Sequence, residues 1–249
     1  MEADIRVIDV VDSTNICIEE LAGAGAREGT CVVAFKQLHG QGRSGRSFYS
    51  PDGGNLYMSV LLRPHDAKQA ERITVAAAVA TTDAIRDKLG INAGIKWVND
   101  IILDGRKVSG MVAQAHNYGT DDFYVVLGIG INIYESPDIP KDIENVYGSL
   151  MGRKCDEGAE AARNFAIGLA REIIKDFSLY YDDFEGNGCA ARYRQRSVVI
   201  GRDVSYICGN DTISARVVDI DDDGGIVLEE GGVRRTYRDG EIRIRLTGV

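Results

Sequence analysis

Signals for metal binding, redox chemistry and secretion are missing from this 249-residue chain. The five cysteines are scattered, and no two have C-x-x-C spacing, which argues against a zinc or redox site and against a disulfide framework. The three histidines also lack the spacing of metal ligands. The first residues are too acidic for a signal peptide, and no apolar run is long enough to span a membrane. We therefore expect a cytoplasmic protein.

Two common nucleotide-binding motifs are missing as well. The chain has no G-x-x-x-x-G-K-[ST] sequence, which excludes a P-loop, and the glycines of residues 128–132 lack G-x-G-x-x-G spacing. A net charge of −9 argues against general nucleic-acid binding, because contacts to a phosphate backbone need clustered cations.

Against this acidic background, one glycine-rich and arginine-rich segment stands out. Residues 36–59 read KQLHGQGRSGRSFYSPDGGNLYMS, with glycines around Arg43 and Arg46. Glycine lets the backbone approach a ligand closely, loop N–H groups can bind an anion, and arginine grips phosphate or carboxylate oxygens. The segment predicts a loop that binds a nucleotide or an acyl phosphate. A flexible surface hairpin is the alternative.

Hydrophobic periodicity predicts a chain of mixed elements up to about residue 196. Strands are expected at 5–11, 31–35, 56–62, 95–98, 107–113 and 123–129, and helices just after 12–15 and at 68–89, 158–184 and 188–195. Gly90 is expected to stop the second helix. The short, turn-rich connections between the last three strands favour an antiparallel meander.

The composition changes near residues 196–200, where we place a domain boundary. Five short β segments follow, at 204–208, 213–218, 226–229, 233–237 and 242–246, separated by turn signals. This spacing fits a small barrel of the SH3 type. We therefore expect one domain at 1–196 and a second at 197–249. The acidic run at 219–223 is predicted to be a solvated β-turn.

Three motifs between the loop and the long helix have two interpretations each. Lys107 begins an apolar strand, and taken alone it is expected to reach solvent, although it could be a fixed cation beside a bound anion. Residues 96–100, KWVND, contain the only tryptophan and read either as a hairpin turn or as the polar end of a strand at a site. Residues 128–132, GIGIN, let the backbone approach a ligand or mark a tight strand crossing.

Taken in order, these motifs resemble those of the biotin–protein ligases, also called biotin–[acetyl-CoA-carboxylase] ligases. Residues 12–15 are similar to DSTN, 37–55 to the biotin loop QxxGRGRxGRxWxSPxGGN, 96–100 to KWPND, 107–112 to KxxGIL and 128–132 to GIGxN. The end of the chain, at 240–245, is similar to GExxxR. The resemblance covers nearly the whole chain. It implies an α+β fold of the class II aminoacyl-tRNA-synthetase type, with a mixed, mainly antiparallel sheet, followed by an SH3-like barrel.

The resemblance also implies a two-step reaction. Biotin is activated by ATP, with Mg²⁺, to biotinyl-5′-AMP, and biotin then passes to a specific lysine of a biotin carboxyl carrier protein. A glycine-rich loop that orders over the ligand would exclude water from the mixed anhydride. Lipoate–protein ligase is the alternative enzyme, and a binding module that needs no ATP is the alternative class.

By resemblance, Lys107 and Arg43 are the catalytic cations, with Lys107 bridging the biotin carboxylate and the α-phosphate. This replaces the solvent-facing interpretation of Lys107. The implied biotin-binding residues are Ser13, Thr14, Asn15, Gln37, Gln41, Gly42, Arg43 and Lys107. The implied ATP and adenylate residues are Arg43, Arg46, Phe48, Lys96, Asn99, Asn132 and Arg245, with Phe48 stacking on adenine. No direct metal ligand can be assigned.

The chain departs from the family pattern at four positions. Gln41 replaces the first arginine of the loop, Phe48 replaces tryptophan, Val98 replaces proline, and Gln114 stands where an acidic residue often follows the KxxGIL strand. Only eleven residues precede Asp12, so we expect the short form without the DNA-binding domain, and neither DNA nor a membrane as a partner. The resemblance also allows a homodimer.

Overall fold

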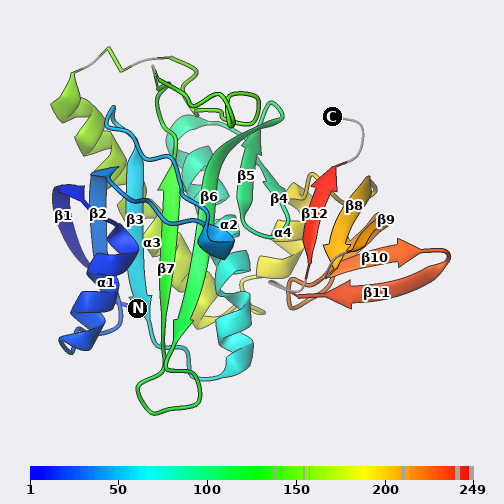
Figure 1. Cartoon of the computed structure of the whole chain (residues 1–249). Coiled ribbons are helices and arrows are strands. Elements are labelled where there is room, and N and C mark those ends of the chain that lie inside the picture. The colour runs from blue at the N-terminus through cyan, green and yellow to red at the C-terminus, as the bar shows by residue number, and fades with distance from the viewer. Residues whose placement is uncertain (137, 154, 157, 209–210, 239–241, 247–249) are drawn as a thin grey trace.

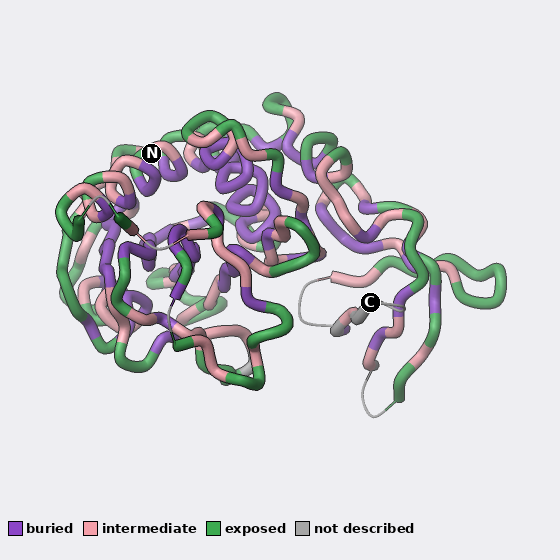
Figure 2. Tube along the Cα trace, turned by 90° about the horizontal axis from the view of Figure 1, so that it is seen from above, coloured by how far each residue is buried: buried purple, intermediate pink, exposed green. Residues whose placement is uncertain are grey.

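The chain folds around two β-sheets of unequal size (Figure 1). The computed structural model describes residues 1–136, 138–153, 155–156, 158–208, 211–238 and 242–246. The larger sheet has the strand order β1-β2-β3-β7-β6-β5-β4, and the smaller sheet has the order β11-β10-β9-β8-β12. Burial is concentrated inside the part that holds the larger sheet, and the smaller sheet projects from it (Figure 2).

The larger sheet is mixed, with one parallel pair and antiparallel pairs elsewhere. Its strands are β1 (Asp4–Val11), β2 (Thr30–Gln37), β3 (Leu56–Leu62), β4 (Gly94–Lys96), β5 (Asp100–Leu103), β6 (Arg106–His116) and β7 (Tyr124–Ile131). Strands β1 and β2 run parallel, whereas β4 to β7 form an antiparallel meander. The sequence predicts a meander of three strands, at 95–98, 107–113 and 123–129, and the structure adds β5 between the first two. The strand predicted at 95–98 ends at Lys96, which pairs with Asp100, so KWVND is indeed a hairpin turn.

Helices cover both faces of this sheet. They are α1 (Thr14–Gly23), α2 (Ala67–Leu89), α3 (Ala159–Asp182) and α4 (Cys189–Arg196). The period-2 alternation of the strands separates two sets of apolar side chains: Val32, Leu61 and Val126 pack with Ile18 of α1, while their neighbours join the larger core with α2 and α3. Gly90 ends α2 in the left-handed conformation, as predicted. Among the described residues, no helix is long and apolar enough to cross a membrane.

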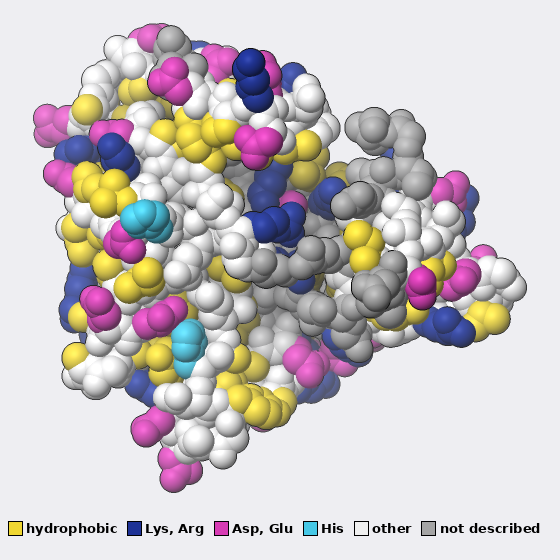
Figure 3. Space-filling view, in the orientation of Figure 1, with side chains coloured by type: hydrophobic (Ala, Val, Ile, Leu, Met, Phe, Trp, Pro, Cys, Tyr) yellow, Lys and Arg dark blue, Asp and Glu magenta, His cyan; other side chains and the backbone are white. Residues whose placement is uncertain are grey.

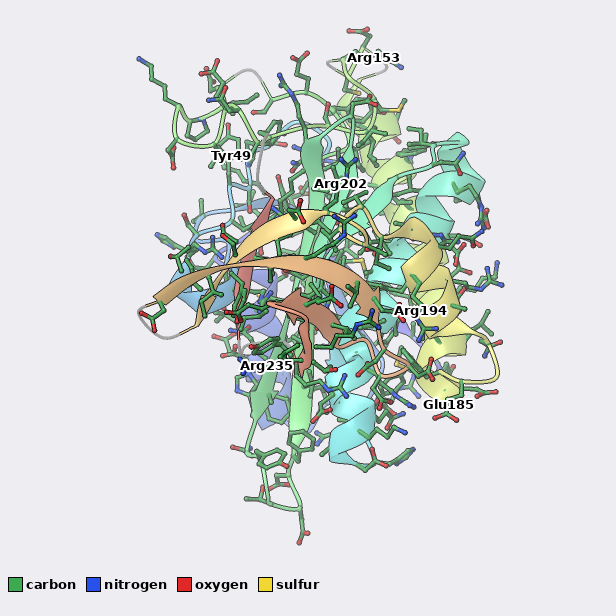
Figure 4. All side chains as sticks on the ribbon, turned by 90° about the vertical axis from the view of Figure 1, so that its right-hand side faces the viewer. Tyr49, Arg153, Glu185, Arg194, Arg202 and Arg235 are labelled. Atoms are coloured by element: carbon green, nitrogen blue, oxygen red, sulfur yellow. The ribbon has the colours of Figure 1, made fainter. Side chains whose placement is uncertain are left out.

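The small sheet is antiparallel, and its strands are β8 (Asp203–Cys208), β9 (Asp211–Ile220), β10 (Ile226–Glu230), β11 (Val233–Tyr237) and β12 (Arg243–Leu246). All five segments predicted from the sequence are confirmed. Arg194 lies where α4 meets this sheet (Figure 4), and its guanidinium pairs with Asp222.

The acidic run between β9 and β10 corrects one expectation, because it is a docking contact and not a solvated turn. Asp223 pairs with Arg72 of α2 at 2.5 Å, and the indole Nε1 of Trp97 donates to the Gly224 carbonyl at 2.9 Å. Gly224 has a positive φ, and a Cβ there would come within 2.3 Å of Val75. This turn therefore fixes the small sheet against the β4–β5 hairpin and α2, beside the candidate site.

Candidate active site

Two adjoining hollows collect most of the residues that the sequence predicts to be functional. The smaller is a cavity of about 40 Å³ between the start of α1, the glycine-arginine loop and strands β3, β6 and β7. The larger is an open cleft that continues from the loop to the small sheet. Lysine and arginine side chains gather in the hollow between the two parts of the molecule (Figure 3).

Uncharged groups build one end of the small cavity. The backbone N and the Oγ1 of Thr14 donate to Gln37 Oε1 at 2.9 and 3.0 Å. The Ser59 hydroxyl lies 2.7 Å from Thr14 Oγ1 and 2.6 Å from Asn15 Oδ1. The Oγ of Ser13, at the N-cap of α1, is buried and has no hydrogen-bond partner in the described part of the chain. A buried polar group without a partner is unusual, which sets this hydroxyl apart from its neighbours.

The two glycines of the GIGIN motif make room for site side chains. A Cβ on Gly128 would lie 2.3 Å from Asn15 Oδ1, and a Cβ on Gly130 would lie 2.3 Å from the Phe48 ring. Gly110 has the same role opposite Lys107, whose Nζ would be 2.7 Å from an added Cβ. These glycines therefore let the side chains of Asn15, Phe48 and Lys107 approach the sheet closely. Whether a ligand also approaches the GIGIN backbone stays a prediction.

The glycine-arginine loop forms a small hairpin that crosses in front of β7 and β6 (Figure 1). Two backbone hydrogen bonds join its arms, from Gly42 N to Arg46 O at 2.7 Å and from Phe48 N to Gly40 O at 2.8 Å, and a third, from Arg46 N to Arg43 O at 3.3 Å, closes the turn. A short 3₁₀ turn, Arg43–Gly45, forms the tip, and Gly45 there has a positive φ. The loop thus presents arginine side chains and backbone N–H groups at the mouth of the cavity.

Charged groups build the other end of the cavity. Lys107 Nζ lies 2.7 Å from Asp100 Oδ1, and both side chains are about one-third exposed or less. Arg43 Nη1 donates to Asn99 Oδ1 at 3.0 Å, while Asn99 Nδ2 donates to the Met111 carbonyl at 2.8 Å. The β4–β5 hairpin turn therefore holds both the partner of Lys107 and the partner of Arg43.

The backbone of Lys107 is held on its outer side by the segment before α3. Lys107 N donates to the Val146 carbonyl at 2.7 Å, and Lys107 O accepts from Gly148 N at 2.9 Å. Asn132 Nδ2 donates to the Gly148 carbonyl at 2.9 Å. Beside this segment, burial raises the pKa of the Tyr147 hydroxyl to about 12, so the ring stays neutral at physiological pH.

The Phe48 ring packs against the sheet between the two ends. It lies edge-on to Tyr57, with ring centroids 6.4 Å apart, and Lys107 Nζ is 5.7 Å from its centroid. The ring lines both the small cavity and the larger cleft. Its position therefore divides the uncharged cavity from the open side where a larger ligand would enter.

Nine of the predicted site residues meet at the small cavity: Thr14, Asn15, Gln37, Gln41, Gly42, Arg43, Phe48, Asn99 and Lys107. Arg46, Lys96 and Asn132 line only the larger cleft. Ser13 lies next to the cavity but lines neither hollow. Arg245 belongs to β12, but its side chain lies outside the described part of the structure.

Three residues of the site were not assigned a role from the sequence. Asp100 pairs with Lys107, Ser59 joins Thr14 to Asn15, and Gln114 Oε1 accepts from Asn15 Nδ2 at 2.5 Å. Ser59 had a visible signal, because it is the one small polar residue in the strand LYMSVLL, which is otherwise aliphatic or aromatic. In the described part of the chain, no three histidine, cysteine or acidic side chains are placed to hold a metal ion together.

Comparisons with known proteins agree with this geometry. A family model described as "Biotin/lipoate A/B protein ligase family" matches residues 7–132, and a second, described as "Biotin protein ligase C terminal domain", matches residues 199–245. The bifunctional ligase/repressor BirA of Bacillus subtilis is 32% identical over 238 residues, covering 92% of this chain and 70% of the relative. The biotin–[acetyl-CoA-carboxylase] ligase of Mycobacterium tuberculosis is 29% identical, covering 91% and 85%.

Solved structures show the same fold. The biotin protein ligase of Aquifex aeolicus, in complex with biotin and ATP, superimposes with a TM-score of 0.79 at 24% identity. The alignment covers 98% of this chain and 99% of that one. Both sheets and their order along the chain are therefore shared with that structure.

Proposed function

This chain belongs to the biotin/lipoate A/B protein ligase family, and we propose that it is an ATP-dependent biotin–protein ligase. Two findings favour biotin over lipoate. The C-terminal residues match a domain that is named for biotin protein ligases, and the Mycobacterium tuberculosis relative is named as a biotin–[acetyl-CoA-carboxylase] ligase. The proposed activity is the transfer of biotin to a lysine of a biotin carboxyl carrier protein.

The observation that carries this proposal is the position of Lys107 at the junction of two unlike surfaces. On one side of it lie the uncharged amides and hydroxyls around Asn15, and on the other lie Arg43 and the open cleft. Biotin has a neutral ureido ring at one end and a carboxylate at the other. With the ureido ring among the amides, the carboxylate would extend to Lys107 and meet a nucleotide phosphate there.

In the first step, a biotin carboxylate oxygen attacks the α-phosphorus of ATP. A new O–P bond forms, the bond to the bridging oxygen breaks, and pyrophosphate leaves. The two reactants are both anions, so the site must offset their repulsion as they approach. In this proposal the ammonium of Lys107 would bridge them, and Arg43 would hold the phosphate side.

In the second step, the neutral amine of a carrier lysine attacks the acyl carbon of biotinyl-5′-AMP. The C–N bond forms, AMP leaves with the electron pair of the C–O bond, and the amine loses a proton to solvent or to a basic group. The Phe48 ring and the loop hairpin would shield the anhydride from water until the amine arrives. Phe48 also offers a face on which adenine would stack.

The triphosphate would occupy the larger cleft, where Arg46, Lys96 and Asn132 lie, and Arg245 is proposed to act on the same side. Mg²⁺ fits this arrangement as part of the ATP complex, since it binds mostly to phosphate oxygens and water and needs only one or two protein carboxylates. We divide the chain into a catalytic domain at 1–196 and a C-terminal domain at 197–249, and we leave a homodimer as a proposal.

Isotope exchange between pyrophosphate and ATP tests the proposal. We expect exchange that depends on biotin and does not occur with lipoate. Exchange that occurs with lipoate alone would assign the chain to the lipoate branch, and no exchange with either acid would favour a binding module. Hydrogen exchange of residues 39–49 is expected to slow when biotin and ATP are added together, because the hairpin would close over the adenylate.

A further inference from the structure

Three amide side chains form a continuous contact from helix α1 to the glycine-arginine loop. Asn15 Nδ2 donates to Gln114 Oε1 at 2.5 Å, and Gln114 Nε2 lies 3.5 Å from Gln41 Oε1. Asn15 is buried, whereas Gln41 and Gln114 are half-buried. The contact therefore joins the innermost part of the small cavity to the base of the loop hairpin, where Gln41 bridges to Ser47.

The donors and acceptors in this contact have a fixed direction. An amide side chain donates at one end and accepts at the other. Asn15 Oδ1 sits against Gly128 beside the Ser59 hydroxyl, which leaves its Nδ2 to face Gln114. Gln114 then accepts with Oε1 and must present Nε2 to the loop. Gln41 in turn meets Gln114 with its acceptor oxygen.

The two glutamines are also two of the four positions at which this chain departs from the motif pattern it resembles. The pattern has arginine at 41 and often an acidic residue at 114, which would be a pair of opposite charges. Here both residues are neutral, and they lie in contact. A single charged residue at either position would face an uncharged amide and have no opposite charge there, so the two departures fit one another.

We infer that Gln114 is a positioning residue that orients Asn15 and, through Gln41, holds the loop hairpin over the cavity by an uncharged contact. The inference rests on the proposed function for its substrate, since Asn15 is placed to bind the ureido ring of biotin. The contact takes the place of an ion pair, so this hold on the loop depends little on ionic strength, unlike the contacts of Lys107 and Arg43 with anionic ligands.

Replacing each glutamine by glutamate in turn tests whether the contact needs the Nε2 donor of Gln114 or only the Oε1 acceptor of Gln41. Gln114→Glu removes the donor that faces Gln41 and sets two oxygens against each other, whereas Gln41→Glu keeps an acceptor in place. We expect Gln114→Glu to raise the KM for biotin about tenfold, consistent with one lost buried hydrogen bond, and to change kcat less than twofold. Gln41→Glu is expected to raise the KM for biotin less than Gln114→Glu does, because an acceptor still faces Gln114 Nε2. The two variants add the same charge and differ only in position.

The double variant Gln41→Arg/Gln114→Glu is the second test. In the single variant Gln41→Arg, the guanidinium would face the Nε2 donor of Gln114, and we expect about a tenfold rise in the KM for biotin. Together the arginine and glutamate can form a charge-assisted pair, so the double variant should return to within threefold of the parent at low salt. Its KM should then rise more steeply with added NaCl than that of the parent, which has no charges in this contact. The control is Gln195→Glu, on the exposed face of α4, which should leave all values unchanged.

A readout without ligand keeps this inference separate from the proposed function. Hydrogen exchange of the Gly42 and Phe48 amides reports the two backbone bonds that join the arms of the hairpin in the empty protein. It should be faster in Gln114→Glu, unchanged in Gln41→Glu and restored in the double variant. Equal effects of the two glutamates, or additive effects in the double variant, would overturn the inference. If the parent protein shows no biotin-dependent isotope exchange between pyrophosphate and ATP, the proposed function is overturned. The amide hydrogen exchange would still show whether Gln114 and Gln41 hold the loop hairpin.

Discussion

The two ends of the small cavity are built from opposite kinds of chemistry. The end at Asn15 is a closed network of amides and hydroxyls, nearly all buried, in which a Cβ on Gly128 would have no room. The end at Lys107 is partly exposed and carries opposite charges on Lys107 and Asp100. One end is suited to recognise a neutral group by shape and hydrogen bonding, and the other is suited to stabilise negative charge during the reaction.

This difference indicates which residues should set the specificity for biotin and which should set the reaction rate. Buried uncharged networks discriminate strongly, because a ligand that leaves one of their groups unpaired loses the full desolvation cost of that group. Charges at a half-open site contribute mainly where charge develops in the transition state. Changes at the Asn15 end should therefore act on the KM for biotin, and changes at the Lys107 end should act on kcat.

Lys107→Ala should give the largest effect, because it removes the cation between two anions. We expect biotinyl-5′-AMP formation to slow about a thousandfold, near the upper range for loss of one electrostatic donor. Binding of biotin alone, measured by calorimetry, should weaken much less. Lys141→Ala, at an exposed position, is the control. A near-normal burst of adenylate in Lys107→Ala would remove Lys107 from the mechanism.

Gly128→Ala should give the next largest effect, at the uncharged end. The added methyl would displace Asn15 and its contact to Ser59, because Oδ1 lies 2.3 Å from the Cβ position. We expect the KM for biotin to rise about a hundredfold, as for about two lost buried hydrogen bonds, with kcat changed much less. Gly23→Ala in α1 is the matched control, since no atom lies within 4 Å of its Cβ position. A drop in kcat without a change in KM would break the proposed division of the cavity.

At the charged end of the cavity, the sequence predicts the cations better than the residues that pair with them. Arg43 stands out because it lies in a glycine-rich loop of an acidic chain, whereas Lys107 was assigned a role only through the family resemblance. Asp100 was assigned no role, because its pairing depends on the register of β5 against β6, where a bulge shifts the strands between Ile101 and Ile102. Local patterns contain no information on such a register, although the KWVND motif already included this residue.

The same limit explains the acidic run that was predicted to be solvated. Asp221 pairs with Arg238 and Asp223 pairs with Arg72, which is 151 residues away in the chain. By contrast, the helices and six of the seven strands of the larger sheet were predicted within a few residues, because hydrophobic periodicity is a local signal. The four-residue strand β5 is too short to show such a period, and it was not predicted. Contacts between distant segments, which position the small sheet and the hairpin, could not be predicted this way.

Asp100→Asn should have a smaller effect than either glycine or lysine substitution. The amide keeps the shape of the carboxylate but no longer holds Lys107 by charge, so the ammonium would sample more positions. We expect kcat for pyrophosphate exchange to fall about tenfold with the KM for biotin unchanged, because the change lies at the charged end. Asp104→Asn on the same hairpin is the control, since Asp104 is exposed and asparagine also tolerates its positive φ. A rise in KM alone would place Asp100 with the uncharged end instead.

Asp176→Asn should have the smallest effect on activity, because Asp176 lies outside both ends of the cavity. It tests whether stability can change while activity does not. Burial and then the charge of Glu172 raise the pKa of Asp176 to about 6 from an ordinary 3.8. A raised carboxyl pKa means that the folded state favours the protonated form, so this contribution to stability is present at low pH and is lost as pH rises through 6. At pH 7 the asparagine should therefore stabilise the fold by about 1 kcal/mol, after allowance for partial exposure. Thermal unfolding measured from pH 7 to pH 4 should show that the stability difference between variant and parent shrinks as the pH falls. The kcat and KM at pH 7 should be unchanged. A stability difference that stays constant with pH would contradict the raised pKa of Asp176 as the cause.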